Sequence, residues 1–267
     1  MSAAIRAELV KLKRPKMLAG VMGLMIALSL LATTLAFALT NSDASSFNEK
    51  RPGAVTLGLA ELGKANGATR GFLIGAGFAG VVVMVTFAVS FASEFGTGTI
   101  RNLFLLDPRR LRVLGGKFLA LMGFAAVGFA VAEVTSIATA AIVAGIRGIP
   151  MHEWTTLEGV RTAVAAYGSV MVAAIGWAIL GTFVALVFRS VAVALAVAVA
   201  WVFPLENILH NSWSGADKLF PGLLLQGIGV GTGGAVSWTQ AVLTWSAYAV
   251  VFLGIAALTL VKRDVTA

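Results

Sequence analysis

Two glycine-rich stretches match patterns that hold phosphates in nucleotide-binding proteins. Residues 58–64, GLAELGK, have the GxxxxGK spacing of a loop whose backbone amides and lysine bind phosphates. The next residue is Ala65, where that loop carries a Ser or Thr hydroxyl for magnesium, and no apolar strand precedes the stretch. Residues 229–234, GVGTGG, fit GxGxxG but lack the surrounding strand–helix–strand unit. Neither stretch predicts a nucleotide site.

The residues that could bind a metal ion or attack a substrate are scarce. The chain has no cysteine, which excludes thiolate metal ligands, cysteine nucleophiles and disulfides. Its two histidines, His152 and His210, have no second histidine or carboxylate at a recognised metal-ligand spacing. We therefore expect no enzyme activity, no metal site and no cofactor on this chain.

One carboxylate lies in the middle of a long apolar stretch. Glu133 is followed closely by Thr135 and Ser136, and an ionisable group at the centre of a membrane is costly unless it is paired, neutralised or facing water. We expect Glu133 to face the protein interior. Two roles stay open for it, namely lining a substrate path or stapling two helices through a hydrogen bond.

The elements that must position these residues are membrane-spanning helices. In the 267-residue chain, 58% of the residues are hydrophobic and 12% are charged, with a mean hydropathy of +0.92, whereas charged residues make up about a quarter of a soluble domain. A helix needs about 20 residues to cross a membrane, and unbroken apolar runs favour helices over barrel strands. The sequence therefore predicts an all-α integral membrane protein with a single transmembrane domain over residues 1–267. Its six predicted spans are residues 17–39, 71–92, 118–146, 161–187, 191–209 and 238–260.

Two features distinguish individual spans. Pro204 and Glu206 interrupt the fifth span, which makes it the weakest of the six. Gly71, Gly75 and Gly80 recur in the second span, and glycine lets membrane helices approach closely. Glycine is also common in membrane helices without such a role, so close packing is one of two interpretations.

The distribution of basic residues predicts the orientation of the chain. With six spans and a cytoplasmic N-terminus, the cytoplasmic segments hold most of the Lys and Arg residues, whereas the outer segments have no net charge. Both termini are therefore expected in the cytoplasm. The isoelectric point of about 10.3 follows from basic loops beside anionic headgroups and does not predict nucleic-acid binding.

Residues 1–16 are expected to form a short amphipathic helix in the cytoplasmic interface. Ile5, Leu9 and Leu12 fall at helical spacing with basic residues around them, and Pro15 ends the pattern. The alternative, a basic leader without regular structure, stays open.

One polar stretch stands out between the apolar segments. Residues 94–117, EFGTGTIRNLFLLDPRRLRVLGGK, follow the second predicted span and lie on the cytoplasmic side. The Gly-Thr pairs favour a turn out of the membrane, and a helix is expected from Thr99 until Pro108 ends or kinks it. A segment that only returned the chain to the membrane would not need an apolar stripe, so the stripe predicts a docking surface. It consists of Ile100, Leu103, Phe104 and Leu106.

Two segments of the chain resemble the membrane permease subunits of ABC-2 type exporters. Those proteins have six spans and a helix before the first span with a pattern like ELxKLxR. After their second span they carry a glutamate, then a Gly-Thr pair, a basic residue, apolar residues and Pro-Arg. Residues 8–14, ELVKLKR, match the first pattern, and Glu94, residues 98–101, GTIR, residues 103–106, and Pro108-Arg109 match the second.

The resemblance implies that residues 94–117 are a cytoplasmic coupling segment whose helix sits in a cleft of a separate ATPase subunit. The residues that it assigns to coupling are Glu94, Gly98, Thr99, Arg101, Leu103, Phe104, Leu106, Pro108 and Arg109. It also implies an outer loop over residues 204–237 with short re-entrant helices, and Phe220-Pro221-Gly222 in an apolar stretch fits such a break. ATP and magnesium would bind to the partner ATPase.

The resemblance further implies the assembly and its location. Two ATPase subunits would drive two permease chains, the second being another copy or a homologue, in the bilayer of a bacterial cytoplasmic membrane. The few polar residues in the spans favour an amphiphilic or apolar cargo, such as a drug, a lipid or a lipid-like metabolite. Two alternatives remain, namely an ion-coupled secondary transporter, which is expected to show two related halves, and a membrane scaffold that transports nothing.

Overall fold

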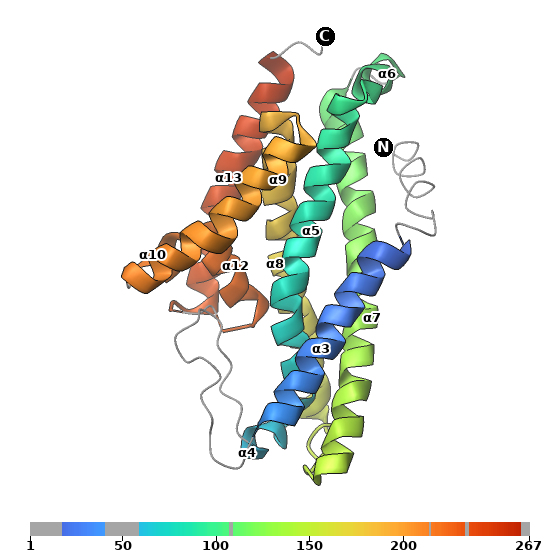
Figure 1. Ribbon diagram of the computed structural model, residues 1–267, viewed down its shortest axis with the longest axis vertical. Coiled ribbons are helices and arrows are strands. Elements are labelled where there is room, and N and C mark those ends of the chain that lie inside the picture. The colour runs from blue at the N-terminus through green and yellow to red at the C-terminus, as the bar shows by residue number, and fades with distance from the viewer. Residues whose placement is uncertain (1–17, 41–58, 107–108, 214, 233–234, 263–267) are drawn as a thin grey trace.

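The computed structural model describes residues 18–40, 59–106, 109–213, 215–232 and 235–262, and within these ranges every regular element is a helix (Figure 1). In chain order the elements are η1 (Leu18–Met22), α3 (Gly23–Leu39), α4 (Leu59–Leu62), η2 (Gly67–Thr69), α5 (Arg70–Gly96), α6 (Thr99–Leu106), α7 (Arg110–Arg147), α8 (Leu157–Phe188), α9 (Val191–Ala200), η3 (Trp201–Leu205), α10 (Glu206–Ser212), α11 (Ala216–Leu219), α12 (Pro221–Gly229) and α13 (Trp238–Lys262). The interfacial helix predicted over residues 1–16 lies outside the described residues.

Six helical stretches of the described chain are long and apolar enough to cross a membrane. They are Ala19–Ala38, Gly67–Gly96, Arg110–Arg147, Leu157–Phe188, Val191–Ser212 and Trp238–Leu260. Each overlaps one predicted span, which confirms the prediction of six long apolar helices. The third differs most from its predicted range, because residues 110–117 already belong to α7. The coupling segment predicted over residues 94–117 is therefore mostly helical, with the end of α5 before α6 and the start of α7 after it.

Helices α5 and α8 form the centre of the bundle. α3 and α7 pack against α5, and α12 and α13 pack against α8. The largest fully buried side chains include the aromatic residues Phe72 and Phe87 of α5, Phe129 of α7 and Trp177 of α8. The other long helices keep many large apolar side chains exposed on their outer faces, as expected of helices that face lipid.

Glycines bring α5 close to its neighbours, which decides between the two interpretations that the sequence left open. A Cβ atom added at Gly75 would lie 2.6 Å from Ser29 Cα of α3, and one added at Gly71 would lie 2.3 Å from Thr33 Oγ1. A Cβ atom at Gly80 would lie 2.4 Å from the indole nitrogen of Trp177 in α8. No larger residue fits at these three crossings without moving the helices apart.

The fifth span changes its helical pitch at Pro204 instead of breaking. A π-helical turn, η3, contains Pro204 and joins α9 directly to α10. Proline has no N–H and clashes with the preceding turn of an α-helix, and a wider turn accommodates both. The interruption predicted from Pro204 and Glu206 is therefore local, and the span continues to Ser212.

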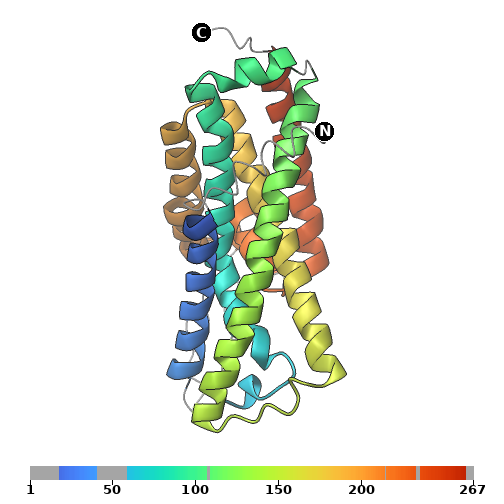
Figure 2. The same ribbon diagram turned by 90° about the vertical axis from the view of Figure 1, so that its right-hand side faces the viewer.

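The bundle has two distinct ends (Figures 1 and 2). α6, the start of α7, the start of α9 and the end of α13 gather at one end, which we call the α6 end. α4, the end of α7 and the start of α8 lie at the opposite end. The last helix of the fifth span, α10, and the two helices that follow it, α11 and α12, form a group that we call the α10–α12 cluster. Within it, α12 packs against α8 and α13.

Candidate functional site

A glycine ends α5 and turns the chain into α6. The backbone N–H of Thr97 donates to Ser93 O at 3.0 Å, and that of Gly98 donates to Phe95 O at 3.2 Å. Gly98 has a φ of +69°, a left-handed conformation that glycine adopts without the Cβ clash of other residues. The Gly-Thr pair noted in the sequence is therefore a helix stop followed by a new helix start.

Threonine hydroxyls hold the two sides of this bend together. Thr97 Oγ1 donates to Ser93 O at 2.9 Å and lies 2.9 Å from Thr99 Oγ1. Thr99 Oγ1 also donates to Glu94 O at 3.4 Å. Because these contacts run from the last turn of α5 to the first residue of α6, they define the angle at which α6 leaves the bundle.

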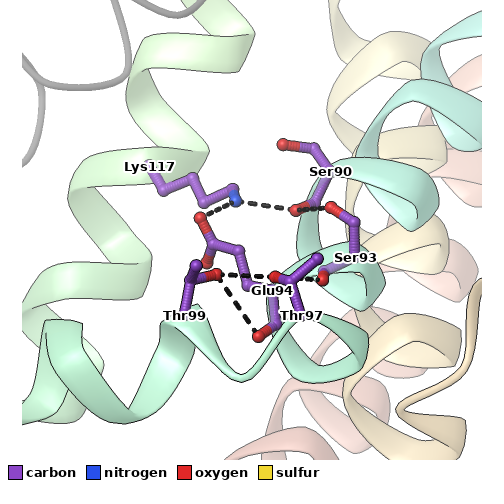
Figure 3. A network of polar contacts seen from close by, with 6 residues as sticks. All are labelled: Ser90, Ser93, Glu94, Thr97, Thr99 and Lys117. Atoms are coloured by element: carbon purple, nitrogen blue, oxygen red, sulfur yellow. Dashed lines mark hydrogen bonds and ion pairs between the residues drawn. The ribbon is translucent and has the colours of Figure 1, made fainter.

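A buried ion pair beside the bend joins α5 to α7 (Figure 3). Lys117 Nζ lies 2.6 Å from Glu94 Oε1, and the two side chains are 5% and 7% exposed. Lys117 Nζ also donates to Ser90 O at 2.7 Å. It lies 5.1 Å from the centre of the Phe91 ring. Removing one partner of a buried ion pair leaves an uncompensated charge and costs about 3–5 kcal/mol. The pair therefore fixes the spacing of the two helices that α6 connects.

Phe104 seats α6 against the bundle. Its ring is half-buried and packs against the central hydrophobic cluster. The Arg110 guanidinium lies 5.3 Å from the centre of this ring, and Arg110 Nη1 donates to Leu260 O of α13 at 2.9 Å. Arg110 thus links α6 and α7 to the last turn of α13, where backbone carbonyls have no partner within the helix.

A second arginine caps the same turn of α13. Arg189 follows α8 in a left-handed conformation with a φ of 53°, and its Nη2 donates to Thr259 O at 3.1 Å. Its guanidinium also lies 5.1 Å from the centre of the Phe95 ring of α5. The ends of α5, α8 and α13 and the start of α7 are therefore tied together at the α6 end by basic side chains.

The structure brings only some of the predicted coupling residues together. Glu94, Gly98 and Thr99 form the bend, Phe104 lies further along α6, and Arg109 is exposed just before α7. The side chains of Arg101, Leu103 and Leu106, and Pro108 as a whole, lie outside the described residues.

Besides Thr97, Arg110 and Arg189, two more residues outside the predicted set belong to this region. Leu105 of α6 is 76% exposed, and Lys117 is the buried partner of Glu94. The sequence did carry a signal for Lys117, because a lysine followed by a long apolar run requires a partner when it is buried. The sequence carried no signal for Leu105. Helical spacing groups residues by face, but it does not show which face of α6 points away from the bundle.

Glu133 faces inward, as predicted. The polar contact that joins its helix, α7, to α3 is made by Ser136 and not by Glu133. The side chain of Glu133 is buried, and its Oε1 has no hydrogen-bond partner among the described residues. Ser136 Oγ lies 2.6 Å from Thr33 Oγ1 and makes the polar contact between these two helices. Phe129, one helical turn before Glu133, lines a small cavity between α5, α7, α8 and α12.

The described parts of the two phosphate-binding lookalikes form ordinary helix ends. Lys64, which would hold a phosphate, is ion-paired with Glu61 of α4, and the hydrogen bond from Lys64 lowers the pKa of the Glu61 carboxyl. Gly229 is the last residue of α12. Across the described ranges no cluster of three His, Asp or Glu side chains is placed to hold a metal ion.

Comparison with protein families identifies a relationship that covers most of the chain. A family model described as "ABC-2 family transporter protein" matches residues 4–205. The matched region includes the bend, α6, the Glu94–Lys117 ion pair and Glu133, and it ends immediately before α10. Searches of the curated proteins and of the solved structures found no match.

Proposed function

The chain belongs to the ABC-2 family of transporter membrane proteins, and from this premise we propose that it is the permease subunit of an ATP-driven exporter. A separate ATPase subunit hydrolyses ATP, and the permease forms the path across a bacterial cytoplasmic membrane. Two permease chains, either two copies of this chain or this chain and a homologue, work with two ATPase subunits. The α6 end faces the cytoplasm, in accord with the basic residues that gather there.

The observation that carries this proposal is the way in which α6 is held. α6 lies across the end of the bundle (Figure 2). Its start is hydrogen-bonded to α5, Phe104 packs against the central cluster, and Leu105 stays 76% exposed. An exposed apolar side chain on a rigidly supported helix suits contact with another protein. These contacts connect α6 to α5 and α7. A force on α6 would therefore move these two spans instead of deforming a flexible loop.

The coupling residues divide into a support and a contact surface. Glu94, Gly98 and Thr99 support α6 through the bend, and Phe104 seats it. Leu105 belongs to the contact surface that enters the ATPase cleft. The predicted residues that we assign to this surface together with Leu105 are Arg101, Leu103, Leu106, Pro108 and Arg109.

The lining of the cavity supports an apolar or amphiphilic cargo. Among the lining residues are Phe129, Val170, Trp177 and Leu225, together with glycines of α5 and α12. The cavity has room for about one water molecule, so a cargo path through it would require these helices to separate. Walls of this kind suit a drug, a lipid or a lipid-like metabolite better than a long sugar chain. Glu133, one turn from Phe129, supplies an acidic group beside this path.

Purification from native membranes tests the proposed function. The tagged chain is expected to retain an ABC ATPase subunit, identified by its mass, together with ATP hydrolysis. Leu105→Asp should abolish both, because it places a charge in an apolar contact. Leu157→Asp is the matched control, since Leu157 is 68% exposed and is the first residue of α8, whose start lies at the opposite end of the bundle. A secondary transporter or a scaffold would retain no ATPase, and equal ATPase retention by the two variants would contradict the role of α6.

A further inference from the structure

Helix α12 closes one wall of the cavity. Its side chains Leu223, Leu224, Leu225 and Ile228 are at most 2% exposed. Leu225 enters a gap on α8 at Gly176, where an added Cβ would lie 2.2 Å from Leu225 Cδ2. Leu225 and Gly229 also line the cavity together with residues of α5, α7 and α8. Movement of α12 would therefore open this cavity.

The first turn of α12 is capped by a residue from another helix. Glu206, the first residue of α10, is fully buried. Its Oε1 accepts from the Gly222 N–H at 3.1 Å, and its Oε2 accepts from the Leu223 N–H at 2.9 Å. These N–H groups have no partner within α12, and a carboxylate at the N-terminus is favoured by the helix dipole. Phe220, the N-cap residue of α12, has no side-chain acceptor for them.

The sequence around the cap leaves room for this carboxylate. Pro221 has no N–H, so Gly222 and Leu223 provide the first donors of α12. A Cβ atom at Gly222 would lie 2.5 Å from Glu206 Oε2. Any larger residue at position 222 would therefore displace the carboxylate from both N–H groups.

Two further contacts tie the cluster together. His210, one helical turn after Glu206, places its Nδ1 2.5 Å from Asp217 Oδ1 of α11. On the other side, Trp245 of α13 donates from Nε1 to Pro221 O at 3.1 Å. The N-terminal end of α12 is thus held between α10 and α13.

We propose that Glu206 is a positioning residue that holds α12 in its closed place, and that the transport step requires its two hydrogen bonds to break. A cap that comes from the N-cap residue of the same helix moves with the helix. A cap that comes from α10 is satisfied only while α10 and α12 keep this arrangement, so it selects the closed state. The role in transport rests on the proposed function, whereas the closed state of α12 is testable without it.

A reporter cysteine inside the closed cavity tests the proposal, because the chain has no cysteine of its own. Leu225→Cys places a thiol at a position that is 1% exposed. A membrane-impermeant maleimide should label it slowly in intact cells when the rest of the chain is native. Ser212→Cys, at an exposed position of α10, should react rapidly in every background. Absence of labelling at Ser212→Cys would contradict the proposed orientation and not the Glu206 contact.

Two changes break the contact from opposite sides. Glu206→Gln keeps the size of the side chain but turns an amide N–H₂ toward one of the two donors, and Gly222→Ala displaces the carboxylate without removing its charge. Each should accelerate labelling of Leu225→Cys by about tenfold or more, as the loss of hydrogen bonds to a charged group predicts. Gly168→Ala in α8 is the control, because a Cβ atom there would have no neighbour within 4 Å and Gly168 does not line the cavity, so it should leave the rate unchanged.

The double variant separates the contact from general destabilisation. Since Glu206→Gln and Gly222→Ala act on one contact, their combination should be no faster than the faster single variant. The assignment of Glu206 as the residue that holds α12 would be overturned by either of two results. One is that the increases in labelling rate multiply in the double variant, and the other is that both single variants are labelled as slowly as the native background. If Glu206→Gln does not accumulate in the membrane, Gly222→Ala alone decides between these outcomes.

The purified complex with its ATPase tests the step in transport. ATP should accelerate labelling of Leu225→Cys in the native background but add nothing in the Gly222→Ala background, where α12 is already released. If ATP does not change the labelling rate of Leu225→Cys in the native background, the transport part of the proposal is overturned. ATPase retention, measured on the same sample, shows separately whether the proposed function holds.

Discussion

The α6 end and the α10–α12 cluster complete helix ends with side chains of opposite charge. At the α6 end, Arg110 and Arg189 donate to carbonyls in the last turn of α13. In the cluster, Glu206 accepts from the first free N–H groups of α12. In both regions the side chain comes from a different helix, so each contact reports how two helices are placed.

The two regions differ in what they leave exposed. α6 keeps Leu105 exposed, whereas the leucines of α12 are buried. One region therefore offers a surface and the other closes a cavity. α13 runs between them, because its last turn binds Arg110 and Arg189 while Trp245 near its start binds Pro221. α13 is therefore one continuous helix that connects the two regions, and the stretch from α9 through η3 to α10 is another.

The largest expected difference between the regions comes from removing one buried charge. Lys117→Met leaves Glu94 without its cation and should lower the free energy of unfolding by about 3–5 kcal/mol. Glu206→Leu should cost less, because its partners are neutral N–H groups. Thermal unfolding in detergent measures both. Glu94→Gln combined with Lys117→Met should be more stable than Lys117→Met alone, and equal stability of the two would show that the pair is not energetically coupled.

The next difference lies within α6 and separates support from contact. Phe104→Ala should lower the free energy of unfolding by about 2 kcal/mol, roughly half the cost of a fully buried phenylalanine, and should also weaken ATPase retention. Leu105→Ala should weaken ATPase retention while the unfolding temperature stays near that of the native chain. A stability loss from Leu105→Ala as large as that from Phe104→Ala would remove the distinction.

A smaller effect is expected where the α6 end meets α13. Arg110→Met removes a charged hydrogen bond to Leu260 O and should cost about 1–2 kcal/mol, because the site is partly exposed. Hydrogen exchange should become faster in the last turns of α13 and stay unchanged in α12. Arg112→Met, at an exposed position of the same turn, is the control and should change neither. Faster exchange throughout α13 would mean that Arg110 supports the whole helix instead of its end.

The smallest effect is expected at the other end of α13. Trp245→Phe keeps an aromatic ring but loses the hydrogen bond to Pro221 O, at a cost of about 1 kcal/mol. Labelling of Leu225→Cys should rise by about fivefold, less than in the Gly222→Ala background. A rise in labelling rate as large as that caused by Gly222→Ala would show that α12 is held mainly by α13 and not by Glu206.

Much of the architecture was predictable from sequence because the bilayer imposes a local rule. A stretch of about 20 apolar residues must form a helix to satisfy its own backbone groups, so the six spans follow from hydropathy alone. The bend before α6 was equally local, since Gly98 and its threonine neighbours act within one turn of chain. Close approach at Gly71, Gly75 and Gly80 was one of two interpretations, and the packing decided in its favour.

The contacts on which both proposals depend were decided only by tertiary structure. Helical spacing shows which residues share a face, but it does not show which face meets the bundle, so the inward place of Phe104 and the outward place of Leu105 depended on how α6 docks. The pairing of Glu94 with Lys117 depended on the relative rotation of α5 and α7 in the same way. In the sequence, Glu206 interrupts a span. It becomes the cap of α12 because the chain turns back over 16 residues and brings a proline, a glycine and two unpaired N–H groups to its carboxylate.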